Sequence, residues 1–151
     1  MIEMKPELKS LGVIHTTLLG AQLVFGAVVY FTNKKQQLHL DKNFTSTFQI
    51  VTIALTVLLV SASFIFFNKK LQQIRQSNID LSSKISQYKI VSIIKFSLLE
   101  GPCLLSIIGY YFTNNIFFFV LAGALIILFA AQRPTPALVS HHLLVDKEDL
   151  T

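Results

Sequence analysis

Long apolar runs separated by short polar segments dominate the pattern of this chain. Four runs stand out, at residues 11–32, 46–67, 90–112 and 116–132. A helix needs roughly 20 mostly apolar residues to cross the hydrocarbon core of a bilayer. The first three runs meet this length, and the fourth approaches it if Gln132 and Arg133 extend toward the membrane surface. We therefore predict an all-α integral membrane bundle of four transmembrane helices.

A membrane β-barrel and a secretory signal peptide fit the apolar runs less well. Strands of a membrane barrel alternate apolar and polar residues over ~10-residue segments, whereas these runs are continuous. A secretory signal peptide has an apolar core of only ~7–15 residues. The first run is longer than that and ends in Tyr30-Phe31-Thr32-Asn33-Lys34-Lys35, so we interpret it as a retained span.

Basic residues are distributed unevenly between the predicted spans. Nine lie before the first span, between the second and third, or after the fourth: Lys5, Lys9, Lys69, Lys70, Arg75, Lys84, Lys89, Arg133 and Lys147. Three lie between the first and second: Lys34, Lys35 and Lys42. Short loops rich in Lys and Arg stay in the cytoplasm, so we predict that both termini are cytoplasmic. The net charge of +5 then reflects topology and attraction to membrane lipid, and no nucleic-acid partner is expected.

The connections between spans differ in length and pattern. Residues 113–115 alone join the last two spans, which predicts a tight antiparallel hairpin. Between the second and third spans, heptad positions are occupied by Leu71, Ile74, Leu81, Ile85 and Tyr88, with Asn78 at an intervening position. We expect both helices to extend beyond the bilayer here. This extension could pack on itself, rest on the membrane surface or bind a cytoplasmic partner. The loop at residues 33–45 could hold one short turn.

The last 18 residues form a tail after a transmembrane domain at residues 1–133. Thr135 and Pro136 resemble the N-cap and first position of a helix. They predict a short helix in the 134–151 tail that ends at about Val145. Its leucines, Leu138, Leu143 and Leu144, are expected on the membrane surface.

Composition narrows the functional classes. Hydrophobic residues make up 52% of the chain and charged residues only 14%, whereas soluble domains contain ~25% charged residues. A lone Cys103 cannot form a disulfide within the chain, and we interpret it as a packing residue. His15, His141 and His142 lack metal-ligand spacing. No nucleophile–base or phosphate-loop motif is present. We expect no metal, no cofactor and no enzymatic activity.

Glu100 is the most informative polar residue. It lies about halfway along the third predicted span, where a carboxylate is costly and commonly functional. Gly101 and Pro102 follow it, and the proline frees the backbone carbonyl of Leu98 one turn earlier. Three roles are open for Glu100: a structural hydrogen bond between helices, a contact with a partner subunit, or binding of a proton or cation.

Gln22 lies at a similar depth in the first span. Its amide could pair with the Glu100 carboxyl, because interhelical hydrogen bonds of this kind occur in membranes. We therefore predict that the two side chains face each other. Lys95 lies five residues before Glu100, about 140° away around a helix, so we expect it to extend to the cytoplasmic surface instead.

Several segments together resemble a group of small four-span bacterial membrane proteins with no established activity. They are Leu11–Phe31, Leu99-Glu100-Gly101-Pro102, Gly109-Tyr110-Tyr111-Phe112-Thr113-Asn114-Asn115 and Arg133-Pro134-Thr135. The resemblance implies a multi-pass protein of the bacterial inner membrane, without implying any chemistry.

Glu100-Gly101, followed by an apolar run that ends at Gly109-Tyr110, is also similar to the carboxylate helix of rotor-ring ATPase proteolipids. However, the first span lacks the dense glycine repeat of those rings, and their four-span forms keep the carboxylate in the last span. The sequence thus predicts a non-catalytic integral membrane protein, either an accessory or a self-associating subunit of a membrane complex. The alternative is an ion- or proton-coupled protein that acts through Glu100.

Overall fold

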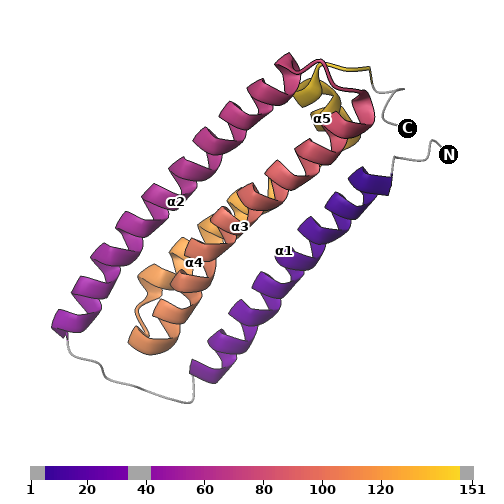
Figure 1. Ribbon diagram of the computed structural model, residues 1–151. Coiled ribbons are helices and arrows are strands. Elements are labelled where there is room, and N and C mark those ends of the chain that lie inside the picture. Colours follow the sequence, from indigo (N-terminus) through magenta and orange to yellow (C-terminus); the bar gives the residue numbers. More distant parts are fainter. Residues whose placement is uncertain (1–5, 34–41, 147–151) are drawn as a thin grey trace.

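Five helices form the protein in the computed structural model, which describes residues 6–33 and 42–146. They are α1 (Pro6–Asn33), α2 (Lys42–Gln76), α3 (Leu81–Thr113), α4 (Ile116–Ala130) and α5 (Pro136–Leu143) (Figure 1). The described ranges contain no strand. The predicted all-α class is therefore confirmed.

Three of these helices, α1, α2 and α3, are long and apolar enough to cross a membrane. This marks the chain as a membrane-embedded helical protein. Helix α4 is equally apolar but has only 15 residues, or about 22 Å at 1.5 Å per residue. It ends at Ala130, two residues before the predicted end of the fourth span, because the chain turns there before the prolines.

Helix α3 lies at the centre of the bundle. It packs against α1, α2 and α4, and Figure 1 shows α1 and α2 on opposite sides of it, with α4 alongside. Half of the most apolar stretch of α3 is buried inside the protein, compared with 17% for α1 and 22% for α2. The outer helices therefore expose most of their apolar side chains, as lipid-facing helices do.

The predicted hairpin between α3 and α4 is present. Asn114 ends α3 in the left-handed conformation, with φ of 50°, which an asparagine adopts more readily than other non-glycine residues. Asn115 then begins α4, and its side-chain oxygen accepts a hydrogen bond of 3.0 Å from the backbone N–H of Phe117. These two asparagines reverse the chain within two residues.

The helical extension between α2 and α3 is also confirmed. Leu71, Ile74, Ile85 and Tyr88 are buried together in one core cluster, while Asn78 is exposed in the turn. The apolar face of this extension therefore packs inside the protein, but not only on itself, because residues of α1 and α5 belong to the same cluster. Asp80 caps α3 by accepting from the Ser83 N–H at 3.1 Å. Hydrogen bonding from the side chain of Ser83, together with this backbone bond, lowers the pKa of the Asp80 carboxyl.

Helix α5 forms as predicted but does not rest on the membrane surface. The Thr135 hydroxyl caps it by accepting from the backbone N–H of Leu138 at 3.3 Å. Val139 and Leu143 are buried in the same cluster as the α2–α3 extension, and Leu144 is exposed. The expectation for the tail leucines was therefore wrong for Leu143, because α5 folds back onto the bundle.

The start of α1, the α2–α3 turn and α5 all lie at one end of the bundle (Figure 1). We call this the basic end, because Lys9, Lys69, Lys70, Arg75, Lys84, Lys89 and Arg133 gather there. The turn predicted within residues 33–45 and the charged end of the tail fall largely on residues 34–41 and 147–151, which lie outside the described residues.

Gly109 provides a test of the packing between α2, α3 and α4. A Cβ atom at this position would lie 2.7 Å from Cδ1 of Phe118 and 2.9 Å from Cε1 of Phe48. Phe118 is fully buried, so a shift of its ring would disturb the packing around it. Gly109→Ala should therefore lower the free energy of unfolding by about 1–3 kcal/mol, measured by SDS titration of helicity in mixed micelles.

Gly123 on α4 is the matched control, because a Cβ there meets no atom within 4 Å. Gly123→Ala should be neutral or stabilise the helix slightly. Equal effects of the two substitutions would contradict the close approach at Gly109.

Candidate functional site

The polar side chains inside the bundle fall into three levels: the basic end, the middle and the opposite end. Lys95 belongs to the basic end and is only 6% exposed. Its ammonium donates a hydrogen bond of 2.6 Å to Oε1 of Gln132 and lies 4.3 Å from the ring centroid of Phe67 and 4.7 Å from that of Phe64. The expectation that Lys95 extends to the surface was therefore wrong, because an amide and two rings hold it inside.

His15 joins α1 to α4 at the same level. It is fully buried, and its Nε2 lies 3.0 Å from the backbone carbonyl oxygen of Phe129. This carbonyl belongs to the last turn of α4 and also accepts a hydrogen bond of 2.9 Å from the backbone N–H of Gln132. The imidazole also stacks on Phe129, with 4.8 Å between centroids, and meets the edge of Phe96 at 5.1 Å. This arrangement gives His15 a role in packing.

His142 connects α5 to α2 and α3. Its Nδ1 lies 2.9 Å from the hydroxyl of Tyr88, and the Arg75 guanidinium donates to its backbone carbonyl. A cavity of about 10 Å³ is lined by His142 and Tyr88 together with Lys95 and Gln132, and this is about the size needed for one water molecule. Burial lowers the pKa of His142 to about 4, with help from the nearby positive charges of Lys95, Arg75 and His141.

The opposite end of the bundle has its own polar contacts. The Asn33 amide, at the last residue of α1, donates to the backbone carbonyl of Tyr110 at 2.9 Å and to Oδ1 of Asn114 at 3.2 Å. The Asn115 amide lies 3.5 Å from Oε1 of Gln49 on α2. Side-chain amides therefore join α1 and α2 to the α3–α4 hairpin at this end.

Gln22 occupies the middle level and is fully buried. Neither its Nε2 nor its Oε1 has a hydrogen-bond partner among the described residues. The predicted hydrogen bond between Gln22 and Glu100 is therefore not formed. Two contacts show how α1 and α3 align along their length: His15 lies beside Phe96, and Asn33 lies beside Tyr110. The two helices therefore run parallel. This register places Gln22 roughly one turn beyond Glu100.

Glu100 itself is half-buried on α3. It makes no hydrogen bond or ion pair within residues 6–33 and 42–146. Ser97 and Gly101, which precede and follow it on the helix, are both exposed. The carboxyl thus lies at the edge of the outward-facing surface of α3, about halfway along the helix.

The remaining mid-level residues contribute to packing. Pro102 is buried within an unbroken α3, and its carbonyl accepts from the Ser106 hydroxyl at 2.8 Å. Cys103 is fully buried, and its Sγ lies 3.9 Å from the carbonyl oxygen of Ala122 on α4. The hydroxyls of Thr52 and Thr56 are buried without a partner among the described residues.

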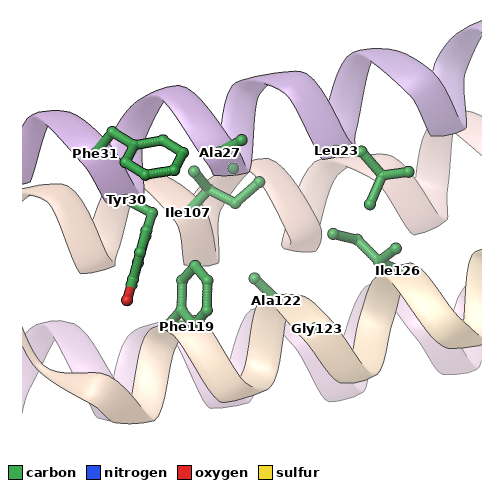
Figure 2. Close-up of a pocket in the computed structure, with 10 residues that line it drawn as sticks. Leu23, Ala27, Tyr30, Phe31, Ile107, Phe119, Ala122, Gly123 and Ile126 are labelled. Carbon is green, nitrogen blue, oxygen red and sulfur yellow. The ribbon is translucent and has the colours of Figure 1, made fainter.

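An apolar groove of about 330 Å³ lies between α1 and α4, with α3 at its base. Figure 2 shows Tyr30 and Phe31 at one end of it, and Leu23 and Ile126 at the other. The small side chains of Ala27 and Ala122 and the absence of a side chain at Gly26 and Gly123 leave this space open.

The polar residues brought together at the two ends connect neighbouring helices. Among the residues that the structure describes, no group of three or more His, Cys, Asp or Glu side chains could hold a metal ion. Sequence reasoning missed Gln132 and Asn33 as partners of buried groups. Their position at the ends of predicted spans was a signal, because amides there can reach unpaired groups of neighbouring helices.

No family model, curated protein or solved structure matches this chain.

Gln22 yields a prediction about stability. An unpaired buried amide costs free energy, and a side chain of similar shape without polar atoms avoids this cost. Gln22→Met should therefore raise the free energy of unfolding by about 1 kcal/mol, measured by SDS titration. A loss of similar size would show that the Gln22 amide has a partner in the membrane. Leu18→Met, one turn earlier on α1, controls for the effect of methionine itself.

His142 yields a prediction about pH. Its folded pKa of about 4 lies below its ordinary value of 6.5, so protonation favours the state in which α5 is released. The docking of α5 should be fully stable above pH 6.5 and weaken as the pH falls toward 4. Hydrogen–deuterium exchange at residues 139–143, corrected for intrinsic rates, measures this.

His142→Gln should remove the pH dependence while the amide retains a contact with Tyr88. His141→Gln is the matched control, because His141 is exposed, and it should leave the pH dependence in place. Protection that stays constant from pH 7 to pH 4.5 in the unaltered protein would contradict this role of His142.

Proposed function

We propose that this protein is a non-catalytic integral membrane protein that acts as a self-associating subunit, with the Glu100 face of α3 as its contact surface. The observation that carries the proposal is an unpaired carboxyl about halfway along a membrane-spanning helix, at the edge of an outward-facing surface. A polar group in hydrocarbon without a partner is costly, so a neighbouring chain that supplies a hydrogen bond gains stability.

The residues around Glu100 favour close approach of a second helix. Ser97 and Gly101 are exposed and four residues apart, which is the spacing of small residues that allows helix backbones to meet. Two copies related by a two-fold axis along the membrane normal would bring their Glu100 side chains together. Neutral carboxyl groups carry both a donor and an acceptor and can pair with each other.

The proposal includes the finer topology. Both termini lie in the cytoplasm, and α4 crosses as a short fourth span in the bacterial inner membrane. The excess of basic residues at one end of the bundle supports this orientation. The resemblance to small four-span bacterial membrane proteins supports the compartment.

The alternative is proton or ion coupling through Glu100, as in a rotor-type proteolipid. The same position at the outward-facing edge of α3 favours it, since such a carboxyl can meet a partner surface that supplies a path to water. A proton path generally needs a chain of ionisable groups. In the described residues, the buried Lys95 and His15 are instead held by Gln132 and Phe129.

Substitution of Glu100 tests the proposal. The mass of the protein–detergent complex, measured by light scattering across a dilution series, should show a dimer or larger oligomer. Glu100→Gln should retain it, because an amide also has a donor and an acceptor. Glu100→Leu should weaken it by about tenfold in dissociation constant, as loss of a membrane hydrogen bond predicts.

Gly101→Leu should also separate the copies, because a large side chain blocks their approach. Gly20→Leu on α1 is the matched control, since a Cβ at Gly20 meets no atom within 4 Å and one at Gly101 meets only Cδ1 of Leu59, in ordinary contact at 3.9 Å. A monomer at all concentrations would contradict self-association. Loss of proton transport in Glu100→Gln, with the oligomer intact, would establish the alternative.

A further inference from the structure

A second groove, of about 370 Å³, opens at the basic end between α1 and the segment that follows α4. Lys9 on α1 and Arg133 after α4 lie on its two sides. Thr16 and Thr17 add hydroxyls, and Val13 contributes an apolar wall. The groove therefore combines two cations with hydroxyl groups and hydrocarbon.

The described part of the chain supplies no carboxylate to neutralise the two cations. Neither Lys9 nor Arg133 makes an ion pair with a carboxylate in residues 6–33 and 42–146. Both side chains are exposed. Two like charges on opposite sides of one groove create a positive potential between them, which favours an anion there.

The depth of the groove suggests which anion it binds. Lys9 precedes the apolar run of α1 by two residues, and Arg133 follows the end of α4 by three. Both charges therefore lie where the apolar stretches end, at the level of lipid headgroups. Val13 is 61% exposed on the apolar surface of α1, so the groove continues onto a face that contacts lipid tails.

We propose that this groove binds the headgroup of an anionic phospholipid, with the phosphate between Lys9 and Arg133. The threonine hydroxyls face the glycerol region, and an acyl chain runs along Val13. Basic pockets between transmembrane helices bind such headgroups in other membrane proteins. Arg133 suits this role because its guanidinium holds phosphate oxygens with two parallel hydrogen bonds.

Gly12 accounts for the open space in the groove. It lines the groove, and a Cβ added there meets no atom within 4 Å. A leucine at this position would occupy the groove without pressing on the bundle. Gly12→Leu therefore distinguishes binding of a headgroup inside the groove from a diffuse attraction between the basic end and an anionic membrane.

The experiment is native mass spectrometry of the full chain released from nanodiscs of equal phosphatidylglycerol and phosphatidylcholine. The unaltered protein should retain phosphatidylglycerol in preference, by up to about 30-fold for two cations near the membrane surface. Lys9→Gln with Arg133→Gln should reduce the preference to about twofold or less. Gly12→Leu should reduce it similarly, although both cations remain.

Lys69→Gln with Lys70→Gln is the matched control, because it removes the same charge from α2 at the same end of the bundle. It should leave the preference unchanged. An equal loss in this control, no effect of Gly12→Leu, or equal retention of both lipids by the unaltered protein would each overturn the proposal. Displacement of phosphatidylglycerol by millimolar inorganic phosphate would also overturn it, since a soluble anion would then be the preferred ligand.

Discussion

The central position of α3 determines how the other helices are held. Hydrocarbon offers no hydrogen bonds, so polar groups inside a membrane bundle must find partners within the protein. Here most of these partners lie on α3 or on its hairpin partner α4. Lys95 bonds to Gln132, His15 to the Phe129 carbonyl, and Asn33 to the Tyr110 carbonyl. The bundle is therefore held by polar contacts at its two ends and by apolar packing between them.

This division explains the different states of the polar groups in the middle. Gln22 is enclosed by apolar packing and has no hydrogen-bond partner in the described part of the chain. Glu100 lies on the central helix α3, about one turn from the level of Gln22 on α1. It is half-buried, at the edge of the outward-facing surface of α3. The enclosed amide lowers the stability of the fold, whereas the half-buried carboxyl is the contact that we propose for self-association.

The basic end combines two kinds of positive charge. Lys95 and Arg75 are used inside the protein, where they hold Gln132 and the backbone of α5. Lys9 and Arg133 face outward across a groove. Burial and the inner cations together lower the pKa of His142, which is therefore neutral at physiological pH. The docking of α5 and the proposed binding of lipid thus depend on separate residues of the basic end.

Much of the fold followed from local pattern. The apolar runs predicted α1, α2 and α3, the three residues between the last runs predicted the α3–α4 hairpin, and Thr135-Pro136 predicted the start of α5. These features depend on neighbours in sequence, on helix periodicity and on capping. The extension of Lys95 to the surface and the pairing of Gln22 with Glu100 were predicted wrongly, because a depth along a helix does not specify the direction in which a side chain points.

The sequence alone therefore determined the class of protein, the approximate helices and the gathering of basic residues at one end. Tertiary structure decided that α3 is central, that α5 folds back over the α2–α3 extension, and that Glu100 lies apart from Gln22. The physical reason is the freedom of each helix to rotate about its own axis. A continuous apolar run has no pronounced polar side, so its own pattern does not specify which side faces the bundle. Packing between helices makes that choice, and with it decides which polar groups meet.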